Sequence, residues 1–152
     1  MYKKVLVPLD GSELAECTLN EITNLVGDGS QVVLLQVVEP ADTFGLAASL
    51  EAEAPNLDLS KIDRQNEEHA RRYLKRMATK LKKKGIEAEV AVVRGKPAEM
   101  INEYANSNKV DLILISTHGR SGVSRWAFGS VADKVLRSAI VPVLLITPKG
   151  CR

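Results

Sequence analysis

Short apolar runs alternate with amphipathic helical segments along the whole of this 152-residue chain. The runs at 4–9 (KVLVPL) and 31–38 (QVVLLQVV) are apolar at nearly every position, which is typical of strands covered on both faces of a parallel sheet. Similar runs predict further strands at 87–93, 111–115 and 142–146. Strands that alternate with helices in this way form right-handed crossover units. The sequence therefore predicts one α/β domain over residues 1–152, a doubly wound, Rossmann-like fold with a five-stranded parallel sheet and helices on both faces.

Helix start and stop signals place the connecting helices. The first helix follows the turn at 10–12, where Ser12 or Asp10 is a suitable N-cap, and a Gly-Asp-Gly stop at 27–29 ends it. Further helices are predicted at 60–84, at 97–107 with a proline near its first position, and from Ser130 onward, where Ser130 and Asp133 fit a capping box. Residues 39–59 lack a regular pattern and are expected to hold a short helix or a flap.

A loop rich in glycine and hydroxyl residues, 116–130, leads from the fourth strand into the last helix. Glycines let a backbone approach a ligand closely, and the open N–H groups at a helix N-terminus attract anions. Arginines in the loop, Arg120 among them, can bind phosphate oxygens in a bidentate manner. The loop therefore indicates a phosphate site, with a simple surface connection as the alternative.

The predicted topology brings a second segment to the same place. In a sheet of order 3-2-1-4-5, the strand order reverses between strands one and four, and ligands bind beyond the carboxyl ends of the strands at that point. The turn at 10–12 and the loop at 116–130 both lie there. Asp10 is a candidate for hydrogen bonds to ribose hydroxyls or for holding a metal ion, with turn and N-cap chemistry as the alternative.

Charge and composition narrow the class of protein. The formal net charge is +2, which does not indicate a nucleic-acid partner, and we interpret the Lys/Arg-rich face of the long helix as solvated. No apolar run is long enough for membrane insertion, and no secretory signal is visible, so we expect a cytoplasmic protein. The two cysteines, Cys17 and Cys151, are far apart in the sequence, and we expect inert thiols rather than a disulfide or a metal cluster.

Several common signatures are missing from the sequence. It contains no P-loop, no G-x-G-x-x-G after the first strand and no G-x-S-x-G or H-E-x-x-H motif. Catalytic residues are therefore not evident, and we do not assign any. Three alternatives stay open: a slow ATP-hydrolysing or adenylating enzyme on the same sheet, a phosphoacceptor receiver domain, and a nucleotide-free dimeric interaction module.

Three segments resemble the universal stress protein family, and the similarity extends over essentially the whole chain. They are VLVPLDGSELA from Val5, DLILISTHGRSG from Asp111 and GSVADKVLRSAIVPVLLI from Gly129. ATP-binding members of this family carry the motif G-x2-G-x9-G-[ST]. The matching positions here are Ser116, Gly119, Gly129 and Ser130, so a small residue, Ser116, replaces the first glycine.

The resemblance implies a homodimeric, ATP-binding regulator of the stress response, with Mg²⁺ or Mn²⁺ as a possible companion of the triphosphate. It implies that Pro8, Asp10 and Ser12 line the adenosine end, and that the backbone of Val38 contacts the adenine. The nucleotide-binding residues expected on this basis, together with those of the glycine-rich loop, are Pro8, Asp10, Ser12, Val38, Ser116, Gly119, Arg120, Gly122, Gly129, Ser130 and Val131.

The last predicted strand supports the implied dimer. It lies at the edge of the sheet in the predicted order, and its residues are apolar, Val141, Val143 and Leu145 among them. An exposed apolar edge favours pairing with another strand, and a second copy of the same strand would cover it symmetrically. We therefore expect an interface through this strand.

Overall fold

A computed structural model describes residues 1–41, 58–117 and 129–147 of the chain. Its strands are β1 (Lys4–Pro8), β2 (Gln31–Val38), β3 (Ala88–Arg94), β4 (Leu112–Ser116) and β5 (Val143–Ile146). Its helices are α1 (Glu13–Glu16), α2 (Thr18–Leu25), α4 (Leu59–Lys82), α5 (Pro97–Ser107) and α6 (Ser130–Ser138). The strands form one parallel sheet of order β3-β2-β1-β4-β5. The predicted fold class and strand order are confirmed.

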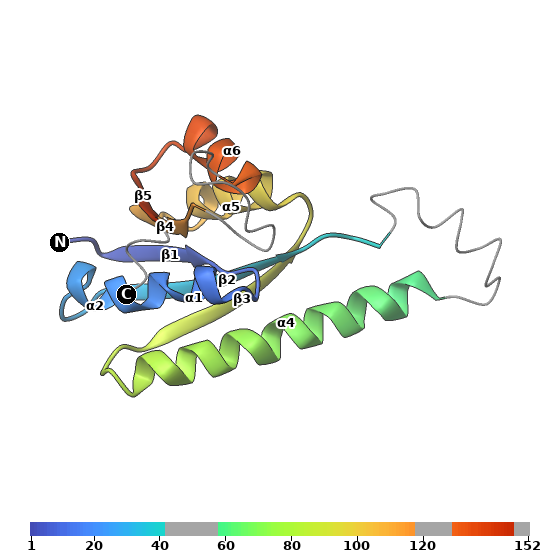
Figure 1. The fold of residues 1–152 in the computed structure, drawn as a ribbon, viewed down its shortest axis with the longest axis horizontal. Helices are drawn as coiled ribbons and strands as arrows, with labels where there is room; N and C mark the ends of the chain where they lie inside the picture. Colours follow the sequence, from blue (N-terminus) through green and yellow to red (C-terminus); the bar gives the residue numbers. More distant parts are fainter. Residues whose placement is uncertain (42–57, 118–128, 148–152) are drawn as a thin grey trace.

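Helices cover both faces of the sheet (Figure 1). On one face α1, α2 and α4 pack over an apolar cluster that includes Val7, Leu34 and Leu74. On the other face α5 and α6 pack over a second cluster that includes Leu6, Leu35 and Val135. Because side chains of a strand alternate between faces, the central strands contribute to both clusters and read as continuous apolar runs.

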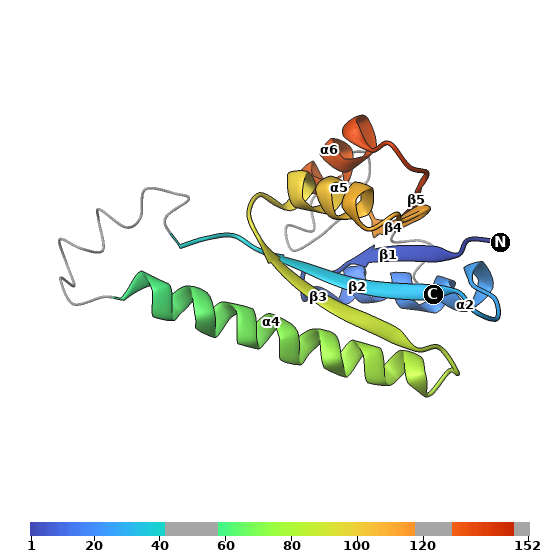
Figure 2. The ribbon, with the colours of Figure 1, turned by 180° about the vertical axis from the view of Figure 1, so that it is seen from behind.

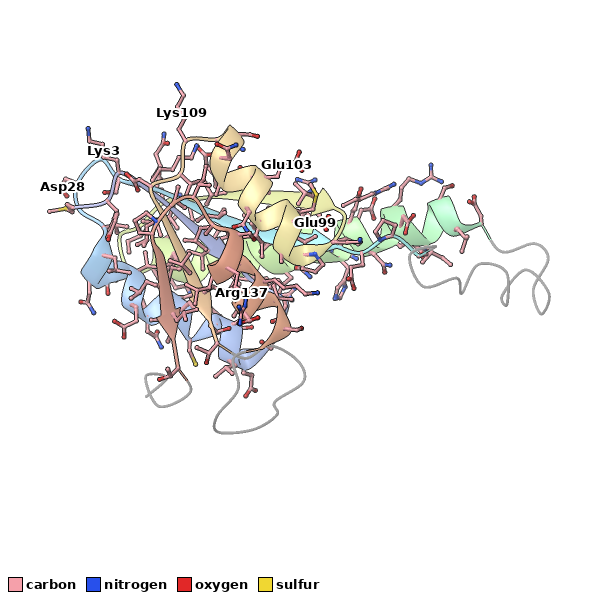
Figure 3. All side chains as sticks on the ribbon, turned by 90° about the horizontal axis from the view of Figure 1, so that it is seen from above. Lys3, Asp28, Glu99, Glu103, Lys109 and Arg137 are labelled. Carbon is pink, nitrogen blue, oxygen red and sulfur yellow. The ribbon has the colours of Figure 1, made fainter. Side chains whose placement is uncertain are left out.

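Charged side chains point away from these two clusters. Figure 3 shows Glu99 and Glu103 on the outer side of α5, and Lys3, Asp28 and Lys109 together at one end of the molecule. All five are exposed. The charge of the chain is therefore carried on the surface, as the predicted helical patterns require.

The first helical pattern is interrupted at Cys17, which separates α1 from α2. Ser12 is the N-cap of α1, as the sequence predicts, and its hydroxyl accepts a hydrogen bond from the N–H of Ala15 at 3.1 Å. Cys17 is disulfide-bonded, so the expectation of inert free thiols is wrong for this residue. The other cysteine of the sequence, Cys151, lies outside the described residues.

The long helix α4 extends past the sheet. Its N-terminal turns reach beyond the carboxyl ends of the strands, as Figures 1 and 2 show from opposite sides. The N-cap is Asp58, whose carboxylate accepts hydrogen bonds from the N–H groups of Ser60 and Lys61. Farther along, Arg94 at the end of β3 forms an ion pair with Glu67. These contacts hold α4 so that its first turns stand above the carboxyl edge of the sheet.

Candidate functional site

The carboxyl ends of β1 and β4 form a topological switch point. The chain leaves β1 toward α1 and α2 on one face of the sheet, whereas it leaves β4 toward α6 on the other. Because the two connections diverge, an opening remains above the ends of these neighbouring strands. A cavity of about 720 Å³ lies at this place.

Residues from several strands and helices line this cavity. The end of β1 contributes Pro8, Leu9 and Asp10, and the end of β2 contributes Gln36, Val37 and Val38. The end of β4 and the start of α6 contribute Ser116, Thr117, Gly129, Ser130, Val131 and Ala132, and the first turns of α4 contribute Leu59, Ile62, Asn66 and His69. Segments far apart in the sequence therefore meet at one site, as the predicted topology required.

The turn after β1 is held by its own side chains. The Asp10 carboxylate accepts a hydrogen bond from the N–H of Ser12 at 2.9 Å, and the next residue, Gly11, has a φ of 86°, a conformation that favours glycine. The Ser12 hydroxyl caps α1 and does not line the cavity. Asp10 does line it, so this turn presents one carboxylate to a ligand.

The start of α6 is open toward the cavity. Gly129, not Ser130, is the N-cap, and no side chain within the described residues caps the helix. The expected capping box does not form, because the Asp133 carboxylate instead accepts a hydrogen bond from Arg137 at 2.9 Å. Within α6, the N–H groups of the first turn have no intrahelical partner. With the helix dipole behind them, they offer an anion site.

Buried polar residues connect β4 to this helix. The side chains of Ser116 and Thr117 are 7% and 2% exposed, and the carbonyl of Thr117 accepts a hydrogen bond from the N–H of Gly129. That bond links the residue after β4 to the N-cap of α6 and holds the helix N-terminus beside the end of the strand. The predicted residues Gly119, Arg120 and Gly122 lie outside the described residues.

The end of β2 offers backbone groups to the cavity, and their direction follows from the sheet register. The Leu35 carbonyl accepts a hydrogen bond from Leu9 on the β1 side, whereas the Val38 carbonyl accepts one from Gly95 on the β3 side. Because successive residues of a strand face opposite neighbours, Val37 faces the β1 side, as Leu35 does. The pairing of β1 with β2 ends at Leu35, and no backbone hydrogen bond within the described residues reaches Val37 from that side. The N–H and carbonyl of Val37 therefore open toward the cavity.

Sequence reasoning missed the wall that α4 contributes. It assigned no site residue to this helix and interpreted its Lys/Arg-rich face as solvated. In the structure, Asn66 and His69 are exposed residues that line the cavity, and the buried stripe runs from Ala70 to Leu81. The length of α4 could have indicated this wall. The helix is longer than the strands, so its first turns extend past the sheet and can line a site above the strand ends.

One buried hydroxyl lies below this wall. The Tyr73 hydroxyl has no hydrogen-bond partner within the described residues. Burial raises the pKa of this phenol, and the nearby carboxylates of Glu16 and Asp10 raise it further.

Metal-binding clusters and membrane-spanning helices are both missing from the described residues. No three His, Cys, Asp or Glu side chains gather there to hold a metal ion. None of the helices there is both long and apolar enough to cross a membrane.

Comparison with known proteins shows the family. Residues 1–147 match the universal stress protein family. The chain is 30% identical to universal stress protein MJ0531 of Methanocaldococcus jannaschii, over 96% of this chain and 82% of that protein. The solved structure of MJ0577 from the same organism superposes with a TM-score of 0.80 at 26% identity, covering 97% of this chain and 96% of that one. An Archaeoglobus fulgidus universal stress protein solved in complex with dAMP has the same fold, with a TM-score of 0.62, 22% identity, and 95% and 98% of the two chains covered. The chain belongs to the universal stress protein family.

Proposed function

We propose that this protein binds ATP at the carboxyl edge of its sheet and acts as a nucleotide-dependent regulator. The observation that carries the proposal is the open N-terminus of α6 beside the ends of β1 and β2, around one cavity of about 720 Å³. A related fold that was solved with dAMP supports an adenine nucleotide as the ligand.

Each end of the nucleotide has a matching part of the cavity. The phosphates would accept hydrogen bonds from the first-turn N–H groups of α6, including that of Val131, and from the Ser130 hydroxyl, with Gly129 leaving space for close approach. We expect Ser116, Gly119, Arg120 and Gly122 to contribute to the same end, as the family motif implies. The ribose would lie at Pro8 and Asp10, where the carboxylate can accept hydrogen bonds from its hydroxyls.

The adenine would then reach the end of β2. The open N–H and carbonyl of Val37 can hydrogen-bond to the edge of the base, whereas the Val38 carbonyl is already used by Gly95. We therefore assign the backbone contact to Val37 and a packing role to Val38. A divalent ion bound with the triphosphate would take its ligands chiefly from phosphate oxygens and water. Asp10, which lines the cavity directly after β1, would supply a carboxylate ligand.

A thermal-melt series tests this proposal. ATP at about 100 times its Kd adds about 2.7 kcal/mol to the free energy of unfolding, which for a chain of this size is a rise in Tm of roughly 5–10 °C. We expect a rise with ATP, ADP and AMP, and a much smaller one with GTP or NADH, each measured with and without Mg²⁺. Absence of any rise at millimolar ATP would contradict the proposal. The same samples, assayed for phosphate release, would show whether ATP is turned over.

We also propose that the protein is a homodimer through β5. This strand is at the sheet edge, and exposed apolar side chains surround it, with Ile140 74% and Leu144 38% exposed. Val141, Val143 and Leu145 are partly buried against the cluster beneath α5 and α6, and they would lie at the same interface. Pairing of β5 with its copy would cover this edge.

Mass measurement in solution tests the dimer. We expect a mass near twice the 16.6 kDa of one chain. Leu144→Lys would place a charge in the apolar edge and should yield monomers, whereas Glu99→Lys on the outer side of α5 should not change the mass. A monomeric wild type at micromolar concentration, or a Leu144→Lys variant that stays dimeric, would contradict this interface.

A further inference from the structure

Gln36 is a polar residue within an otherwise apolar part of β2. Apart from Gln31 at the exposed start, it is the one polar residue of β2, between Leu35 and Val37. Gln36 is two residues after Leu34, so both side chains point to the same face of the sheet, the one covered by α1, α2 and α4. A leucine or valine would continue the apolar pattern at this position.

The side-chain oxygen of Gln36 has no hydrogen-bond partner in the part of the chain that the structure describes. This atom, Oε1, is buried, and it is one of three such side-chain atoms within the described residues. The other two are Tyr73 Oη and Asn102 Oδ1, and neither residue lines the cavity. The Asn102 amide is held through its nitrogen, which donates to Ser138 Oγ at 2.7 Å, whereas no hydrogen bond within the described residues holds the Gln36 amide. A buried acceptor without a donor is unfavourable, so the free protein carries a cost that a ligand can relieve.

The position of Gln36 in the sheet indicates which part of a bound nucleotide it would contact. The order of the sheet places β2 two strands from β4, which is about 10 Å between their ends. With phosphates at the start of α6, after β4, and the ribose at the end of β1, the base lies at the end of β2. Other polar residues that line the cavity are Glu39, directly after β2, and Asn66 and His69 of α4.

We propose that the Gln36 side-chain amide accepts a hydrogen bond from the exocyclic amino group of adenine and so selects adenine nucleotides. This inference rests on the proposed ATP site and adds a side-chain contact to the backbone contacts of Val37. An amide can also turn to donate its NH₂ group, so a base with an oxygen at the same position, as in GTP, is not the sharpest probe. The sharpest probe is purine riboside 5′-triphosphate, which carries neither group there.

Binding measurements on matched variants test the contact. The Kd values of ATP, purine riboside 5′-triphosphate and 2′-deoxy-ATP are determined calorimetrically for wild type, Gln36→Met and Gln31→Met. Methionine keeps the length of glutamine but cannot take its hydrogen bonds, and Gln31 is an exposed control on the same strand. In wild type and Gln31→Met, loss of the amino group should weaken binding about tenfold. In Gln36→Met the penalty for the missing amino group should be clearly smaller than in wild type, because only its hydrogen bond to the Val37 carbonyl would remain.

Other outcomes overturn the inference in distinguishable ways. An equal penalty for the missing amino group in wild type and Gln36→Met would show that Gln36 does not contact it. A 2′-deoxy-ATP penalty that disappears only in Gln36→Met would assign the amide to the ribose instead. If wild type bound none of the three nucleotides, the proposed ATP site itself would fail, and this inference with it.

The stability of the free variant separates a ligand contact from a structural one. Gln36→Met removes a buried acceptor that has no partner, so without nucleotide its Tm should equal or exceed that of wild type. A clear fall in Tm would show that Gln36 stabilises the fold, and would contradict the inference that its hydrogen bond forms with a ligand.

Discussion

Ser130→Asp should abolish nucleotide binding while leaving the free protein at least as stable as wild type. Ser130 is the first residue of α6 and is exposed beside the cavity. An acidic residue in the first turn of a helix interacts favourably with the helix dipole, by about 0.3–1 kcal/mol. The same carboxylate would occupy the place of the phosphates and repel them, which should weaken ATP binding by at least about 100-fold.

A graded pair of variants makes this result specific. Ser130→Ala removes one hydroxyl but keeps the backbone N–H groups, so we expect a loss of roughly tenfold. Calorimetric titration with ATP, together with melting of each variant without ligand, gives the two quantities. If Ser130→Asp bound ATP with the wild-type affinity, the phosphates could not lie at the start of α6. A fall in the Tm of the free variant would mean that the helix cap was misjudged.

Leu34→Ala should strongly destabilise the fold. Leu34 is fully buried in the middle of β2, where its register partners are Val7 on β1 and Val90 on β3. It belongs to the cluster that holds α4 against the sheet. Truncating a buried leucine costs about 2–5 kcal/mol, because the surrounding side chains cannot close the cavity. The expected fall in Tm is roughly 5–15 °C.

The control for this prediction is Leu136→Ala, at a leucine that is 42% exposed on α6. It should change the free energy of unfolding by less than about 1 kcal/mol, measured by urea denaturation at low protein concentration. Equal effects of the two substitutions would contradict the assignment of Leu34 to the core. A Leu34→Ala variant that loses ATP binding only in proportion to its unfolded fraction would confirm that the cluster beneath α4 acts on the fold and not on the site.

The strands and their order were predictable because each strand is a short, nearly unbroken apolar run. The pattern of QVVLLQVV in β2 follows directly from burial on both faces. Helix ends were less predictable. Gly129 rather than Ser130 caps α6, and the pattern gave no sign of the interruption at Cys17. Both depend on how the helix meets its neighbours, which local propensity does not contain.

The parts of the candidate site in which glycine and hydroxyl residues follow a strand were predictable. The parts in which the register of the sheet determines which backbone groups face the cavity were not. That Val37 opens to the cavity while Val38 bonds to Gly95 depends on which residues of β2 face β1. The contribution of His69 depends on how far α4 extends past the strands. Neither quantity can be derived from the sequence of one segment alone.

Hydrogen exchange with and without saturating ATP tests the central claim most directly, because it reports where the nucleotide binds. We expect slower exchange in ATP at three separate segments that meet at the cavity: the turn at 9–12, the end of β2 at 37–39 and the first turn of α6 at 130–132. The amino ends of the strands and the C-terminal half of α4 should be unchanged. Protection confined to the basic surface of α4, or none at these three segments while ATP raises the Tm, would contradict the account and place the nucleotide elsewhere.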